Sequence, residues 1–94
     1  MRLQGETYFE SRLTGRAIVP VEMGERSFTE RLDKALLALC KQMTVPIPVW
    51  LKNNTKQFAH YRMTIFFPDQ FVEKVAFDQF QVRLMDDDLR EENI

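Results

Sequence analysis

A helix start signal followed by an apolar stripe constrains the fold of this chain more than any other feature. Ser27 and Glu30 have the S-x-x-E spacing of a capping box, in which each side chain bonds to a free backbone amide at a helix start. The apolar residues at helical spacing after this signal are Phe28, Leu32, Ala35, Leu36, Leu39 and Met43. They predict one buried helix face. Because Pro46 disfavours helical geometry just before it, we expect a helix over about residues 28–42.

The N-terminal part of the chain predicts a β-hairpin. Residues 2–10 alternate between apolar and polar side chains, which is typical of a strand with one wet face. We expect a turn over residues 12–15, where Gly15 is free to take a positive φ, and a second strand over residues 16–23. Pro20 has no amide hydrogen to donate to a neighbouring strand, so either the second strand is predicted to lie at a sheet edge or Pro20 is predicted to sit where its nitrogen faces solvent.

The C-terminal half predicts two more strands and two short helical segments. β-branched and aromatic residues favour a strand at residues 62–67, and alternation favours a last strand at 77–85. Short helices are expected at 55–62 and 68–75. The predicted fold class is therefore α+β, a single small domain in which about four strands, antiparallel or mixed, form a sheet. The main helix and one or two short helices pack on this sheet.

The segment VPIPVW, residues 45–50, connects the main helix to the first short helix. Two prolines alternate with Val45, Ile47 and Val49, so the segment is expected to be extended, either polyproline-like or as an edge strand. It either turns the chain and packs Trp50 against the core or presents the indole ring to a partner. We expect Trp50 to pack against the core.

The formal net charge of −1 hides an uneven distribution of charged residues. Residues 86–94, DDDLREENI, contain five acids and one base. Between Lys34 and Pro68 the chain has no carboxylate. We therefore expect a mildly basic domain over residues 1–85 and an acidic C-terminal tail over 86–94. Such an asymmetry is typical of a protein with an anionic partner, of a tail that covers a basic surface, or of a solvated surface without a role.

The sequence contains no recognisable catalytic or metal-binding constellation. One cysteine, Cys40, and one histidine, His60, are too few for a zinc finger, and no glycine-rich phosphate-binding motif is present. We therefore expect a protein that is not an enzyme and uses no metal or cofactor. The lack of a cysteine pair and of a long apolar run predicts a cytoplasmic protein that does not engage membranes.

The leading functional hypothesis is a small interaction domain, an accessory or regulatory protein of bacterial or phage type. It would act by binding another protein or by self-association. Leu37 falls outside the apolar stripe of the main helix, and Ile47 lies in the proline-flanked segment. With Trp50, these residues are the predicted partner-binding residues, since exposed apolar side chains and extended edges recruit partners.

The alternative hypothesis is a nucleic-acid-binding module built on residues 50–62, WLKNNTKQFAHYR. This stretch combines aromatic and basic side chains and has no acid. Single-stranded nucleic acids are bound by such a mixture of stacking surfaces and cations, although a core with a solvated rim produces the same pattern. The predicted nucleic-acid-binding residues are Trp50, Lys52, Lys56, His60, Tyr61 and Arg62.

Overall fold

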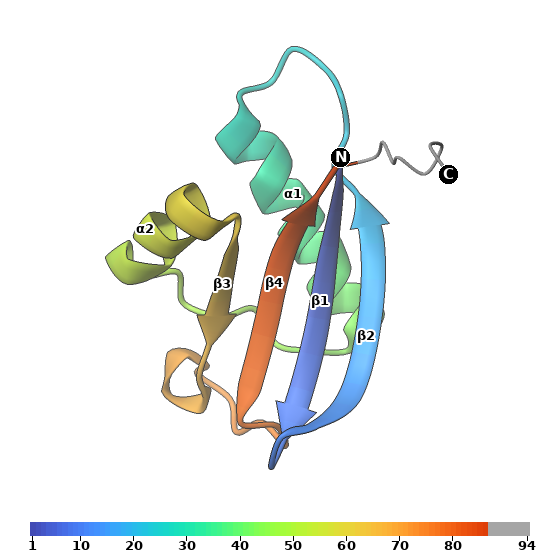
Figure 1. Cartoon of the computed structure of the whole chain (residues 1–94). Helices are drawn as coiled ribbons and strands as arrows, with labels where there is room; N and C mark the ends of the chain where they lie inside the picture. Colours follow the sequence, from blue (N-terminus) through green and yellow to red (C-terminus); the bar gives the residue numbers. More distant parts are fainter. Residues whose placement is uncertain (87–94) are drawn as a thin grey trace, which may run out of the picture.

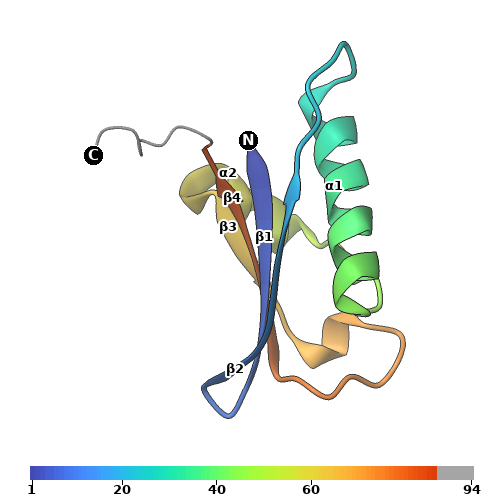
Figure 2. The same ribbon diagram turned by 90° about the vertical axis from the view of Figure 1, so that its right-hand side faces the viewer.

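A computed structural model describes residues 1–86, and it has a four-stranded antiparallel sheet with a long helix packed across one face (Figure 1; Figure 2). The strands are β1 (Arg2–Phe9), β2 (Arg12–Pro20), β3 (Met63–Phe66) and β4 (Gln79–Met85), in the order β2-β1-β4-β3. The helices are α1 (Phe28–Met43), α2 (Lys52–Tyr61) and the 3₁₀ helix η1 (Pro68–Gln70). The predicted α+β class is confirmed.

The capping box fixes the start of α1 as the sequence predicts. The Ser27 Oγ accepts a hydrogen bond of 3.2 Å from the Glu30 amide, and the Glu30 carboxylate accepts one of 3.4 Å from the Ser27 amide. The last helical residue is Met43, one residue beyond the predicted end. The next residue, Thr44, caps the helix: it has a left-handed conformation with φ 57° and donates its amide to the carbonyls of Cys40 and Lys41.

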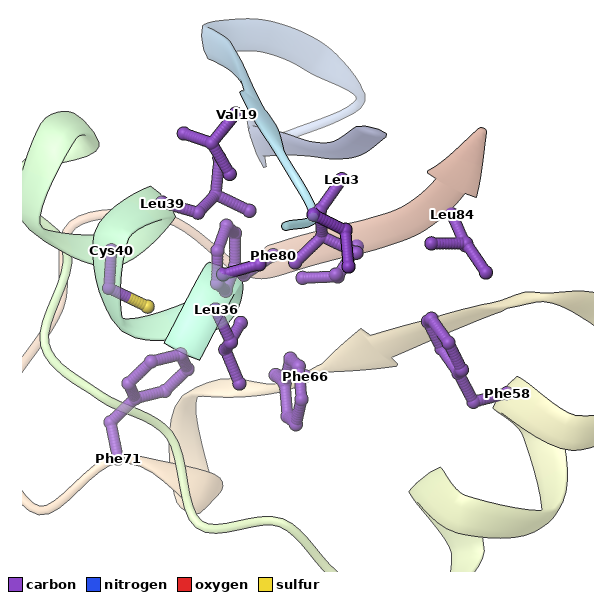
Figure 3. Close-up of a cluster of buried hydrophobic side chains, with 13 residues drawn as sticks. Leu3, Val19, Leu36, Leu39, Cys40, Phe58, Phe66, Phe71, Phe80 and Leu84 are labelled. Atoms are coloured by element: carbon purple, nitrogen blue, oxygen red, sulfur yellow. The ribbon is translucent and has the colours of Figure 1, made fainter. Parts of the chain in front are cut away.

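The core lies between α1 and the sheet face that it covers (Figure 3). Leu3, Phe66 and Phe80 from three different strands are fully buried there, together with Leu39 of α1. α1 packs closely on β1 at Gly5, where a Cβ atom would stand 2.8 Å from the Leu39 Cδ2. A side chain at this position would displace the Leu39 and Met43 side chains, so Gly5 permits the close packing of the two layers.

The hairpin turn lies earlier than the sequence predicts. Glu10 and Ser11 form it, and both have a positive φ, of 51° and 68°. Such a turn matches the twist of the strands it joins, but neither residue is the glycine or asparagine that normally signals it. Gly15 is therefore inside β2, opposite Thr7, rather than in a turn. The prediction for Pro20 is confirmed, because it ends β2 at the edge of the sheet.

The segments after α1 differ from their predicted bounds mainly at α2 and η1. Residues 45–51 form neither a helix nor a strand. α2 begins three residues earlier than predicted and stands beside β3, at the edge of the sheet (Figure 1). η1 is a single short turn, because after Gln70 the chain leaves helical geometry at Phe71, with φ −116° and ψ 137°.

The remaining predictions on chain organisation are tested only in part. None of the helices within residues 1–86 is long and apolar enough to cross a membrane. Of the predicted acidic tail, only Asp86 belongs to the part that the structure describes, and residues 87–94 lie outside it.

Candidate functional site

An apolar groove of about 560 Å³ lies between α1 and α2. Its apolar lining consists of Phe28, Leu32 and Leu36 from α1, Phe58 and Ala59 from α2, and Trp50 from the connecting segment. Thr29, Asp33 and Thr55 supply polar groups. The groove therefore combines three aromatic rings with two leucines and a few polar atoms, a composition typical of binding pockets.

Trp50 is the residue of the groove whose position is most firmly determined. Its ring lies 5.9 Å from that of Phe58, edge to face, and 5.6 Å from that of Phe66, measured between centroids. The indole Nε1 donates a hydrogen bond of 2.7 Å to the Thr55 Oγ1. The expectation that Trp50 packs against the core is thus confirmed, while the rest of its ring lines the groove.

A buried amide positions α2 and thereby the far wall of the groove. Asn54 is only 3% exposed. Its Oδ1 accepts hydrogen bonds from the Leu51 amide and from Gln70 Nε2, both of 2.9 Å, and its Nδ2 donates one of 2.7 Å to the Thr64 Oγ1. One side chain therefore caps α2 and ties it to β3 and η1. The sequence alone predicts no more for Asn54 than a turn or a helix-cap position.

The rim of the groove carries one carboxylate with no partner within residues 1–86. Asp33 is exposed and accepts no hydrogen bond or ion pair from any of them. The nearby cations of α1 are engaged elsewhere. Lys34 pairs with Glu22 at 3.3 Å, and Arg31 donates to the carbonyls of Glu22 and Arg26 while its guanidinium lies 5.6 Å from the Phe28 ring centroid.

The three predicted partner-binding residues do not form one surface. Trp50 lines the groove, whereas Leu37 and Ile47 are 49% and 57% exposed and lie outside it. The sequence analysis missed Phe28, Leu32 and Phe58 as groove residues, because a helical apolar stripe is the ordinary signature of a core face. Only the position of α2 leaves the edge of that stripe accessible.

The predicted nucleic-acid-binding residues separate into two groups. Lys52, Lys56, His60, Tyr61 and Arg62 are all exposed, on α2 or directly after it. Trp50 is not on that side, since its ring faces the groove and its N–H is bonded to Thr55. An aromatic and basic surface on α2 therefore has to be described without Trp50.

The titratable groups with altered pKa values have structural partners or are buried. Burial raises the pKa of the Glu6 carboxyl, but hydrogen bonds from Arg16 and Tyr8 outweigh this effect, so the pKa lies below its ordinary value. The hydrogen bond to Glu6 raises the pKa of the Tyr8 hydroxyl. Burial raises the pKa of the Cys40 thiol to about 11, which disfavours the thiolate that nucleophilic chemistry requires.

Comparison of the chain with protein-family models, with curated proteins and with solved structures found no match. Within residues 1–86, no group of three or more His, Cys, Asp or Glu side chains is placed to hold a metal ion. The surfaces of the domain are the basis for a functional proposal, and the groove between α1 and α2 is lined mainly by apolar side chains.

Proposed function

We propose that this chain is a non-enzymatic protein-binding domain, and that the α1–α2 groove receives an amphipathic segment of a partner protein. The segment carries apolar side chains next to a lysine or arginine. The observation that carries this proposal is the groove itself, whose rings belong to Phe28, Trp50 and Phe58. Aromatic pockets at the centre of an interface supply most of its binding energy.

The groove is formed before any partner arrives. Contacts with Phe58 and Phe66 and the hydrogen bond to Thr55 hold Trp50 in place. The Asn54 hydrogen bonds hold the start of α2 against β3 and η1. Because these side chains are already ordered, binding costs less conformational entropy than it does on a flexible surface.

The charge at the rim supports a basic partner. Asp33 offers a carboxylate that has no partner within residues 1–86 and lies beside the apolar lining, and an apolar segment with a flanking cation matches both features. Charged groups at the rim of an interface select among partners and orient them more than they add affinity. In this proposal Asp33 selects partner segments that carry a cation, and the aromatic lining supplies most of the binding energy.

A selection from a library of displayed random peptides tests this proposal. Wild-type protein is expected to enrich peptides with apolar residues at i, i+3 or i+4 and i+7 together with lysine or arginine. Thr29→Arg places a long side chain on the groove, and it is expected to weaken the enriched peptides by about tenfold or more. Gln42→Arg adds the same charge at the opposite end of α1, and it is expected to leave their affinity unchanged.

Three results would overturn the proposal. The first is a selection without a common pattern or with an acidic one. The second is equal binding of the enriched peptides to wild type and to Thr29→Arg. The third is a dimer, seen by sedimentation equilibrium, that Thr29→Arg dissociates and Gln42→Arg does not, because a second copy of this chain would then occupy the groove.

A further inference from the structure

One side of α2 carries a row of basic residues that do not line the groove. Lys52, Lys56 and His60 are four residues apart and exposed, so their side chains follow one another along one side of the helix at intervals of about 6 Å. No carboxylate within residues 1–86 forms an ion pair with either lysine. The groove involves Thr55, Phe58 and Ala59 of the same helix, and Ala59 also lines the hollow next to the row, but Lys52, Lys56 and His60 do not line the groove.

Two shallow hollows connect this row to the sheet. The first, of about 580 Å³, is lined by Lys56, Gln57, His60 and Tyr61 among others. The second, of about 420 Å³, shares Gln57 and Tyr61 with the first and reaches Arg83 on β4. They form one continuous surface, called here the basic surface, with the charged and aromatic residues Lys52, Lys56, His60, Tyr61, Arg62 and Arg83.

The positive charge of the basic surface is largely uncompensated within the part of the chain that the structure describes. Asp86 is the carboxylate that pairs with it, through a 3.4 Å contact with Arg62. Glu6, on the neighbouring strand β1, forms its ion pair with Arg16 and also interacts electrostatically with Arg83. Lys52, Lys56 and Arg83 face solvent without an ion pair in residues 1–86. Such a surface is complementary to a ligand with repeated negative charges.

Exposed rings lie among these cations. Tyr61 is 66% exposed, and its ring stands edge-on to that of His60, with 4.6 Å between the ring centroids. Neither ring is needed to fill the core. The side-chain amides of Asn53 and Gln57 line the same hollow and provide hydrogen-bonding groups for base edges.

We infer that the basic surface binds single-stranded nucleic acid. Lysine and arginine side chains contact phosphates, and Tyr61 and His60 stack on unpaired bases. In a duplex the base faces are stacked on one another. The phosphates of a duplex can therefore contact the cations, but its bases cannot stack on the Tyr61 and His60 rings. The inference does not depend on the groove, and either site can be present without the other.

Titration of a fluorescent single-stranded oligonucleotide, with a duplex of the same sequence beside it, tests this inference. Four phosphate contacts give a log–log salt slope of about −2.8 on a single strand, so affinity is expected to fall roughly fiftyfold between about 50 and 200 mM salt. The single strand is expected to bind more tightly than the duplex. Equal binding of both, or no binding at the lower salt concentration, would overturn the inference.

Two sets of variants separate a specific surface from net charge. Lys52→Glu with Lys56→Glu is expected to abolish binding, whereas Lys41→Glu with Lys74→Glu makes the same charge change on exposed lysines elsewhere and is expected to retain most of it. Tyr61→Leu keeps the charge and removes the stacking ring, and it is expected to weaken single-strand binding by about fivefold or more.

Equal losses in the two lysine pairs would mean that net charge alone attracts the oligonucleotide, and an unchanged affinity of Tyr61→Leu would mean that no base stacks there. Either result contradicts the inference. Thr29→Arg, which blocks the groove, is expected to bind the oligonucleotide as wild type does. A negative result for peptide binding in the groove therefore does not affect the test of the basic surface. Circular dichroism of each variant verifies that the fold is intact.

Discussion

The indole Nε1 of Trp50 donates a 2.7 Å hydrogen bond to the Oγ1 of Thr55, five residues further along the chain. The proline-rich segment ends at the first residue, and the first turns of α2 contain the second. This hydrogen bond therefore holds the end of the proline-rich segment against the start of α2. It also orients the largest side chain of the groove, so the shape of the groove depends on it.

Thr55→Val removes this acceptor with little change in shape or helix propensity. The free energy of unfolding is expected to fall by about 1 kcal/mol, because a hydrogen bond is lost but the indole N–H is near solvent. Time-resolved anisotropy of the single tryptophan is expected to show faster motion of the ring. An unchanged anisotropy decay would mean that the aromatic contacts alone hold Trp50.

Asn54 and Asn53 are adjacent asparagines with opposite roles. Asn54 is buried and bonded to three segments, whereas Asn53 is exposed on α2. Asn54→Ala is expected to lower the free energy of unfolding by about 2–3 kcal/mol, because it leaves buried polar groups of Thr64 and Gln70 with fewer partners. Asn53→Ala is expected to change it by less than about 0.5 kcal/mol. Urea unfolding of both variants measures the difference, and equal effects would contradict the assignment.

Gly5→Ala tests the spacing between α1 and the sheet. The added Cβ would stand 2.8 Å from the Leu39 Cδ2 and 2.9 Å from the Met43 Sδ. Relief of these contacts requires the packed Leu39 and Met43 side chains to shift, so the free energy of unfolding is expected to fall by about 1–3 kcal/mol. A variant that is as stable as wild type in urea would show that α1 does not pack this closely on β1.

The Glu6 carboxylate is expected to stabilise the fold in a pH-dependent way. Its pKa lies below the ordinary value of 4.5 in the folded protein, so its contribution is fully present above that value and disappears as the pH falls through the lower, folded-state pKa. Glu6→Gln is expected to lower the free energy of unfolding by about 1 kcal/mol at neutral pH. The difference from wild type is expected to shrink below pH 4.5.

Urea unfolding of both proteins at several pH values measures this gap. Glu73→Gln, a change at an exposed carboxylate, serves as the control and is expected to follow the wild-type curve. A gap between Glu6→Gln and wild type that stays constant across the acid range would contradict the account of the Glu6 interactions with Arg16 and Tyr8.

The features that the sequence predicted well depend on short-range patterns. Ser27 and Glu30 are three residues apart, and the bond between them requires only a helix. Pro20 cannot donate to a neighbouring strand, and this favours an edge position for the strand that contains it. The element order and the α+β class follow from such local signals.

The features that the sequence did not predict depend on contacts between distant residues. Glu10 and Ser11 adopt positive φ values without glycine or asparagine, so the hairpin register must come from the pairing of the strands. Asn54 links α2 to η1 through a hydrogen bond with Gln70, sixteen residues further along the chain, and this contact exists only in the folded protein. The groove exists because α2 is tied to β3 and η1 and does not cover the edge of the α1 stripe, and no local pattern contains that information.

Binding of matched peptides, followed through Trp50 emission, tests the protein-binding groove most directly. One peptide carries leucine and phenylalanine at i, i+3, i+4 and i+7 with lysines between them, and the other has the same apolar residues with glutamates. The lysine peptide is expected to change the emission saturably and to bind more tightly. Asp33→Asn is expected to weaken it about two- to fivefold, while Asp69→Asn, at an exposed carboxylate on η1, leaves it unchanged. No emission change with either peptide, or equal binding of the lysine peptide to wild type and Asp33→Asn, would contradict the account.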